Sequence, residues 1–142
     1  GHSAGGYLTS MIGLDKRWLE PYGIDPDTAF VALIPYSGQV VTHFERRREL
    51  GLPDTQPLVD DMAPLSYVRP DCRPMLILSG DREREMLGRY EENAYFWRMM
   101  RVAGHPDVRI CEFDGFDHGN MPQAGHFVAV RYIREMERRM DR

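Results

Sequence analysis

The strongest constraint on the fold is the alternation of short apolar runs with stretches of helical periodicity. The runs are FVALIPYSG (30–38), PMLILSGD (74–81) and VRICEF (108–113). Continuous apolar runs that lack polar alternation are typical of strands buried on both faces of a parallel sheet. We therefore predict three strands, and an α/β fold in which helices flank a mostly parallel sheet.

Four stretches between and around these runs have the spacing of an apolar helix face or the charge pattern of a surface helix. They cover residues 4–14, 42–50, 88–104 and the C-terminal stretch from about 126. The expected apolar stripes are Ala4, Tyr7, Leu8, Met11 and Ile12 in the first, Tyr90, Ala94, Trp97 and Ala103 in the third, and Ala129, Ile133, Met136 and Met140 in the last. Gly104 is the expected C-cap of the third helix.

Composition excludes several classes of partner. The 142 residues are 42% hydrophobic, which suits one domain with one core. The net charge is -4, and short arginine clusters are interleaved with glutamate, so no nucleic-acid face is predicted. No apolar run approaches the roughly 18 residues of a membrane span. Cys72 and Cys111 have neither metal-ligand spacing nor the density of a disulfide framework, and we expect two buried thiols.

The chain opens on GHSAGG, which contains G-x-S-x-G with Ser3 at its centre. This pattern suits a sharp strand-to-helix turn in which Gly1 and Gly5 must lack side chains so that neighbouring strands fit. The helix predicted from Ala4 supplies N–H groups and a positive dipole end beside the serine. Ser3 is therefore a candidate nucleophile.

A serine hydroxyl needs a histidine to take its proton and a carboxylate to orient that histidine. His118 stands in GFDHGN after the last predicted strand, between Gly115 and Gly119, at the sheet edge where catalytic groups gather. We expect His118 to be the base; the alternative is a structural loop histidine. The other histidines are His2, aimed away from Ser3, His43 in the charged helix, His105 after a C-cap and His126 at the start of the last helix.

The carboxylate candidates lie in SGDRERE, directly after the second predicted strand. They are Asp81, Glu83 and Glu85, and the segment also fits an ordinary solvated charge run. Asp117 is a poor candidate, because adjacent side chains in an extended loop diverge from His118 rather than meet it.

These motifs in this order resemble the C-terminal half of an α/β-hydrolase, a fold that uses the order nucleophile, acid, histidine. The GHSAGG spelling and GRYEENAYFWRMMR resemble esterase/lipase-like enzymes of the hormone-sensitive-lipase and feruloyl or acetyl-xylan esterase kind, a group that includes arylformamidases. The resemblance covers essentially the whole chain.

The resemblance implies roles for particular residues. The acid of this family commonly stands three residues after the glycine that ends its strand, which gives Glu83 in place of the usual aspartate and leaves Asp81 as the alternative acid. The oxyanion hole uses the N–H of Ala4 and a second N–H from a glycine-rich loop earlier in the fold, for which this sequence has no candidate. Residues 36–67 correspond to a possible cap insertion, where Phe44, Leu50, Leu52 and Tyr67 line a pocket or belong to the core.

The expected function is a serine hydrolase that cleaves a small-molecule carboxylic ester through an acyl-enzyme, with Ser3, His118 and Glu83, and without a metal or organic cofactor. Arylformamidase or serine peptidase activity with the same residues, or a hydrolase-like domain that only binds, are the alternatives. Residues 1–142 are then expected to be the C-terminal part of a single domain that starts at the nucleophile turn, and inactive and aggregation-prone in isolation.

Overall fold

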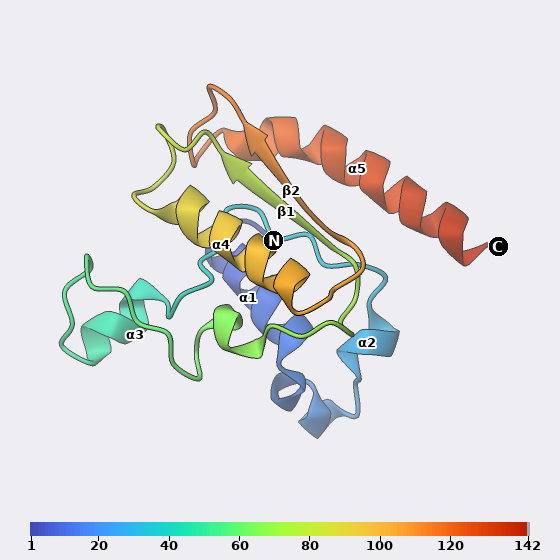
Figure 1. The fold of residues 1–142 in the computed structure, drawn as a ribbon, viewed down its shortest axis with the longest axis horizontal. Helices are drawn as coiled ribbons and strands as arrows, with labels where there is room; N and C mark the ends of the chain where they lie inside the picture. Colours follow the sequence, from blue (N-terminus) through green and yellow to red (C-terminus); the bar gives the residue numbers. More distant parts are fainter. Residues whose placement is uncertain (142) are drawn as a thin grey trace.

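A computed structural model describes residues 1–141 and shows a small parallel sheet between helices (Figure 1). The helices are α1 (Ala4–Leu14), α2 (Pro26–Ala29), α3 (Phe44–Glu49), α4 (Arg89–Val102) and α5 (Met121–Met140), and the strands are β1 (Met75–Gly80) and β2 (Val108–Phe113). Short 3-10 helices cover Lys16–Trp18, Glu20–Tyr22 and Pro64–Tyr67. The α/β class predicted from the sequence is confirmed.

The sheet is built around β1, which pairs in parallel with β2 from Met75↔Val108 to Gly80↔Phe113. On the other side of β1 lies the first apolar run, which forms two parallel bridges, Leu33↔Met75 and Tyr36↔Leu78, in one register. The ladder is interrupted between them because Pro35 has no N–H to donate. The expected strand over 30–38 is therefore a bridged segment rather than a regular strand.

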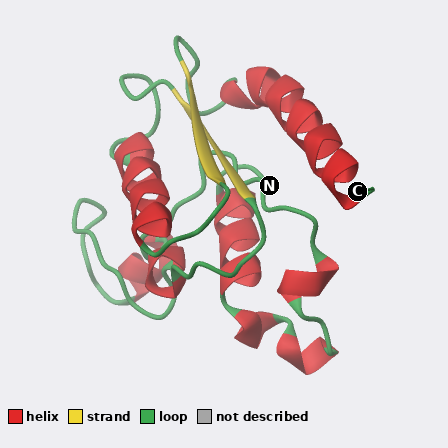
Figure 2. Cartoon of the chain, turned by 45° about the vertical axis from the view of Figure 1, so that its right-hand side comes forward, coloured by secondary structure: helices red, strands yellow, loops and turns green. Residues whose placement is uncertain are grey.

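Two apolar layers cover the two faces of β1. Met75 and Ile77 face a cluster that includes Phe96 and Met100 of α4 and Leu14 of α1. Leu76 and Leu78 face the opposite cluster, which includes Met121, Ala129, Tyr132 and Met136 of α5. Figure 2 shows α5 on one side of the strands and α1 and α4 on the other. Every residue of β1 is buried, as a strand between two helical layers requires.

The buried face of α4 differs from the stripe that the sequence predicts. Arg89, Asn93, Phe96 and Met100 are buried, whereas Ala103 is exposed. The face is shifted by one residue because two polar side chains find acceptors inside. Arg89 Nη1 donates to the Ser37 carbonyl oxygen at 2.5 Å, and Asn93 Nδ2 donates to that of Gly38 at 2.8 Å. Asn93 Oδ1 is buried without a hydrogen-bond partner among the described residues. Such buried polar contacts leave no apolar signal in a sequence.

The last helix follows its predicted stripe only in part. Ala129 and Met136 are buried, but Ile133 is 43% exposed and Met140 is 64% exposed. Cys72 is buried and Cys111 is half-buried, and both are free thiols. Within residues 1–141 no helix combines the length and apolarity that a bilayer crossing needs.

Candidate active site

Ser3 lies at a constrained turn between a bridged residue and α1. Its φ of 55° and ψ of -116° are unusual for a residue with a side chain. The Ser3 N–H donates to the Tyr36 carbonyl oxygen and the Tyr36 N–H donates to that of Gly1, both at 2.8 Å. These bonds on either side of His2 hold a conformation that otherwise costs about 1–3 kcal/mol.

Glycine is required at some positions of this turn and not at others. A Cβ on Gly1 would lie 2.3 Å from the Gly5 carbonyl oxygen, so a side chain there cannot be accommodated without movement. A Cβ on Gly6 would lie 2.8 Å from the Tyr36 carbonyl oxygen. A Cβ on Gly5, in contrast, meets nothing within 4 Å among the described residues. A steric need for glycine therefore exists at Gly1, but the clash there is with Gly5 of the same turn and not with a neighbouring strand as predicted, and no such need is found at Gly5.

His118 stands in the loop between β2 and α5, and its ring nitrogens lie within hydrogen-bond distance of two side chains. Its Nε2 lies 2.9 Å from Ser3 Oγ, and its Nδ1 lies 2.5 Å from Glu85 Oε1. Asp117 fixes the loop next to it, because its Oδ1 accepts the N–H of Gly119 at 2.9 Å and that of Asn120 at 3.0 Å. The structure therefore brings Ser3 and His118 together, as the sequence predicts.

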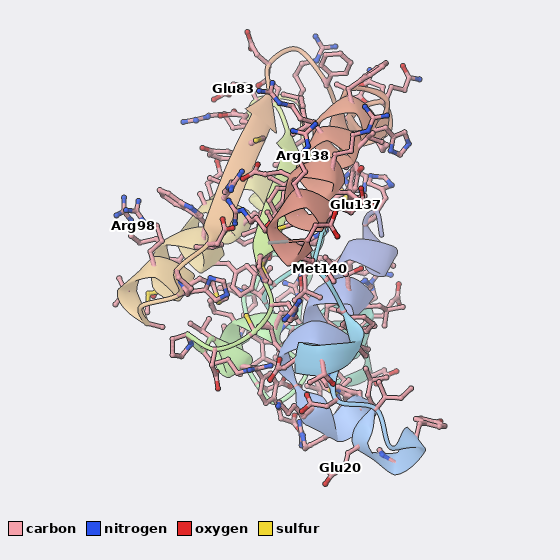
Figure 3. All side chains as sticks on the ribbon, turned by 90° about the vertical axis from the view of Figure 1, so that its right-hand side faces the viewer. Glu20, Glu83, Arg98, Glu137, Arg138 and Met140 are labelled. Carbon is pink, nitrogen blue, oxygen red and sulfur yellow. The ribbon has the colours of Figure 1, made fainter. Side chains whose placement is uncertain are left out.

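The carboxylate beside His118 is Glu85 rather than Glu83 or Asp81. The carboxylate of Asp81 accepts the backbone N–H groups of Gly115 at 2.7 Å and Glu83 at 2.9 Å. The side chain of Glu83 is exposed and lies at the periphery of the molecule (Figure 3). The Glu85 N–H donates to the Asp81 carbonyl oxygen at 2.8 Å, which closes a turn. The carboxylate that contacts His118 therefore stands five residues after Gly80 instead of three.

The carboxylate of Glu85 is enclosed, and four donors surround it. Besides His118, Oε1 accepts the Met86 N–H at 2.9 Å, and Oε2 accepts the Ser37 hydroxyl at 2.5 Å and the Gly80 N–H at 3.2 Å. Its side chain is 0% exposed. Burial by itself raises the pKa of Glu85, but the hydrogen bonds from His118, Ser37 and Met86 outweigh it and lower the pKa to about 2. Glu85 is therefore ionised at neutral pH.

Ser37 is a site residue that sequence reasoning missed. It has a φ of 44°, which only a few per cent of non-glycine residues adopt. Its carbonyl oxygen accepts a hydrogen bond from Arg89 Nη1 at 2.5 Å, and Arg89 Nε pairs with Glu92 Oε1 at 2.8 Å. Burial raises the pKa of Glu92 to about 7 in spite of Arg89. In the sequence Ser37 only ends an apolar run, so no pattern points to its contact with Glu85.

The N–H of Ala4 is available beside Ser3. Ala4 is the first residue of α1, and the first N–H groups of a helix have no acceptor within it. The Ala4 residue is also exposed. An oxygen atom that approaches Ser3 from solvent can therefore accept a hydrogen bond at this helix end.

His2 is oriented differently from the prediction. Instead of aiming away from the site, its Nε2 lies 2.9 Å from the carbonyl oxygen of His118, and the two imidazole rings lie 4.7 Å apart between centroids. The other three histidines bond elsewhere: His43 accepts the Glu45 N–H, His105 Nε2 contacts the Cys72 carbonyl oxygen, and His126 Nδ1 contacts the Tyr36 hydroxyl.

The segment 36–67 contains α3 and borders a cavity of about 480 Å³. Phe44 lines this cavity from the segment, and Met86 and Leu87 line it from the loop that follows Glu85. Of the other residues expected to line a pocket, Leu50 is 46% exposed, and Tyr67 packs against the α1 and α4 side of the core. Over residues 1–141 no cluster of three or more His, Cys, Asp or Glu side chains is arranged to hold a metal ion.

Comparison with solved structures identifies the fold. The native and propionate-bound structures of an esterase from the Planctomycetes species Thermogutta terrifontis each match with a TM-score of 0.71 and 21% sequence identity. The matches cover 96% of this chain and 53% and 54% of those chains, so the chain spans about half the length of that esterase. The chain has the fold of the C-terminal portion of an α/β-hydrolase.

A second α/β-hydrolase match is more distant. Acylaminoacyl peptidase from Pyrococcus horikoshii matches with a TM-score of 0.58 and 18% identity, over 87% of this chain and 20% of that one. No protein-family model and no curated protein sequence matches the chain. The relationship is therefore visible in the fold and not in overall sequence similarity.

Proposed function

We propose that the protein is a serine hydrolase that cleaves a carboxylic ester. One observation carries the proposal: Ser3 Oγ, the two ring nitrogens of His118 and the Glu85 carboxylate form a continuous chain of contacts of 2.9 and 2.5 Å. An ionised, buried carboxylate on Nδ1 fixes the tautomer in which Nε2 is free to accept a proton from the serine. Glu85 takes the role that the family resemblance implied for Glu83.

In the proposed mechanism Ser3 Oγ attacks the ester carbonyl carbon while His118 Nε2 takes the hydroxyl proton. The tetrahedral intermediate collapses, the alcohol leaves with that proton, and Ser3 retains the acyl group. Water then attacks the acyl-enzyme, again with His118 as the base, and the carboxylic acid is released. Glu85 stays ionised and stabilises the imidazolium in both steps.

The backbone at Ala4 serves as one donor of the oxyanion hole. Its N–H stabilises the negative oxygen that forms when Ser3 attacks, and the start of α1 adds a positive dipole end. One such donor contributes about 10²- to 10³-fold to the rate in a well-studied hydrolase. The positive φ of Ser3 fits a nucleophile elbow, which presents the serine beside this N–H.

We propose that residues 1–142 form the C-terminal part of one hydrolase domain, because they match about half of the esterase chains. Structures of Thermogutta terrifontis esterase 2 include butyrate-bound and cyclosarin-phosphonylated forms. By analogy we propose a small-molecule ester with a short acyl chain as the substrate.

We further propose that segment 36–67 caps the substrate pocket. Phe44→Ala is then expected to change the preference of the enzyme between short and long acyl chains.

Turnover of an aryl acetate by the full-length protein tests the proposal. The wild-type protein is expected to release the phenol, and Ser3→Ala, with unchanged circular dichroism, is expected to lose this activity. Ser10→Ala is the matched control, because Ser10 is a buried serine on α1, the helix that begins directly after Ser3. Equal turnover by the wild type and Ser3→Ala would exclude Ser3 as the nucleophile.

The same residues also suit an arylformamidase or a serine peptidase. Rates with an aryl acetate, a feruloyl ester, N-formylkynurenine and a peptide anilide distinguish these activities from the ester hydrolase. The higher TM-scores of the esterase matches favour the ester. Saturable binding of such compounds without any turnover would instead indicate a hydrolase-like binding domain.

A further inference from the structure

The residue before Ser3 is held rigidly against the base loop. His2 bridges Tyr36 in parallel, the neighbouring Ser3 N–H and Gly1 carbonyl both bond to Tyr36, and the Gly5 N–H donates to the His2 carbonyl oxygen at 2.8 Å. Its backbone is therefore fixed within the sheet. Its side chain reaches out of this fixed position to His118, 116 residues further along the chain.

We propose that His2 is a positioning residue that clamps the loop of the catalytic base to the nucleophile segment. A carbonyl oxygen is only an acceptor, so the 2.9 Å contact requires a proton on His2 Nε2. The clamp joins His2 to the backbone of His118, while Ser3 contacts the ring of the same residue. This inference rests on the proposed function, because it assigns His2 a part in the same reaction.

The clamp is useful because the direct Ser3–His118 contact does not persist through the proposed cycle. Once Ser3 carries an acyl group, its hydroxyl no longer exists, and the imidazole loses this partner. The His2 bond is made to the main chain and is unaffected by acylation. His118 is therefore still in place when water enters, and a displacement of about 1 Å at this point can cost about 10²-fold in rate.

The surroundings of His2 keep its ring neutral. Burial lowers the pKa of His2, and the neighbouring His118 and Arg89 lower it further, while the bond to the His118 carbonyl and the charge of Glu85 oppose this. A neutral ring adds no charge beside the imidazolium that forms on His118 during the reaction. The inclined packing of the two rings, with 37° between their planes, limits rotation of the base.

Two substitutions separate the hydrogen bond from the ring contact. His2→Phe keeps an aromatic ring against His118 and removes the donor, and we expect kcat to fall by about 10- to 100-fold. KM is expected to fall with it, because slower deacylation leaves kcat/KM, which reports acylation, within about twofold of the wild type. His2→Gln keeps an N–H donor, and we expect it to recover part of the loss. His105→Phe is the matched control, because His105 Nε2 also contacts a backbone carbonyl oxygen, that of Cys72 at 3.1 Å, and lies outside both the site and segment 36–67.

The kinetic step affected is a further readout that general destabilisation would not reproduce. With a p-nitrophenyl ester, His2→Phe is expected to retain the burst that reports acylation and to lose steady-state turnover, because deacylation depends most on the clamp. A kcat within twofold of the wild type, or equal losses in His2→Phe and His105→Phe, would overturn the proposal.

A measurement that does not depend on catalysis tests the His2 clamp separately from the proposed hydrolase function. Nitrogen-15 NMR of the histidine rings in the full-length wild-type protein at pH 8 is expected to show His2 as the Nε2–H tautomer. The Nδ1–H tautomer would overturn the clamp even if the enzyme is active. If the protein neither hydrolyses esters nor reacts at Ser3, the proposed function fails, and the tautomer still decides whether the contact exists.

Discussion

The loops at the carboxyl ends of β1 and β2 supply Glu85 and His118, which contact each other beside Ser3, yet only His118 could be identified from the sequence. The loop after β2 contains one histidine between two glycines, and that residue, His118, contacts Ser3. The loop after β1 contains three carboxylates, and the turn closed by the Asp81 carbonyl oxygen decides which of them faces inward. Residue type is sufficient for the first loop, whereas backbone geometry selects the residue in the second.

The loops also depend on each other. The Asp81 N–H donates to the Phe116 carbonyl oxygen at 2.8 Å, and the Asp81 carboxylate accepts the Gly115 N–H. Asp81 thus joins the two backbones, while Glu85 joins the β1 loop to the imidazole of His118. Two acidic residues four positions apart therefore make separate contacts: Asp81 with backbone N–H groups and Glu85 with the imidazole.

The largest expected effect is the loss of ester hydrolysis on substitution of Glu85, which substitution of Glu83 should not cause. Glu85→Gln leaves the shape of the side chain intact but removes the charge that orients and stabilises the His118 imidazolium, and kcat/KM is expected to fall by about 10³- to 10⁴-fold. Glu83→Gln is the matched control and is expected to stay within twofold of the wild type. If steady-state ester hydrolysis instead shows the larger fall in kcat/KM for Glu83→Gln, the acid is Glu83 and not Glu85.

A smaller effect concerns acid stability. The pKa of Glu85 is lowered from 4.5 to about 2, so its ionised form stabilises the folded protein above about pH 4.5, and this contribution is lost as pH falls toward 2. The full loss is about 3 kcal/mol. Urea unfolding at several pH values is expected to show a steeper decline below pH 4.5 for the wild type than for Glu85→Gln. Parallel curves would contradict the assigned ionisation of Glu85.

Variants of Ser37 test how much the hydrogen bond from the bridged segment to Glu85 contributes to stability. Ser37→Ala removes the hydroxyl that donates to Glu85, which is expected to cost about 1.5–3 kcal/mol of unfolding free energy, the range for a bond to a charged group. Ser37→Gly removes the same hydroxyl but suits the φ of 44°, so it is expected to unfold at a higher denaturant concentration than Ser37→Ala. If both variants match the wild type, the Ser37 contact contributes nothing.

The smallest expected effect is that of the structural carboxylate. Asp81→Asn weakens the bonds to the Gly115 and Glu83 N–H groups, which together lower the pKa of Asp81. The melting temperature is expected to fall by less than in Ser37→Ala, and kcat/KM by far less than in Glu85→Gln. Calorimetry and the ester assay measure both, and a loss of activity as large as that of Glu85→Gln would make Asp81 the acid.

Most of the fold follows from sequence patterns, and the departures have local physical causes. Helix α1 and strands β1 and β2 lie where their periodicity and apolar runs predict. The run at 30–38 forms bridges instead of a strand because Pro35 cannot donate, and α4 is rotated because Arg89 and Asn93 find polar partners inside.

In the candidate site, too, some residues could be predicted from sequence patterns and others could not. The contact between Ser3 and His118 could be predicted because each residue stands in a short glycine-containing motif next to a predicted helix or strand. Glu85 and Ser37 could not, because a five-residue spacing after Gly80 and a serine at the end of an apolar run are not distinctive in a single sequence. His2 and His118 are 116 residues apart in the sequence, so no local sequence pattern predicts the contact between them.

The central claim is that His118 and Glu85 activate Ser3 as a nucleophile, and a fluorophosphonate probe tests it most directly. After reaction of the full-length protein, peptide mass spectrometry is predicted to locate the probe on Ser3. Labelling is expected to be absent in Ser3→Ala, strongly slowed in Glu85→Gln and unchanged in Glu83→Gln. No labelling of the wild-type protein, or labelling that survives Ser3→Ala, would contradict the account.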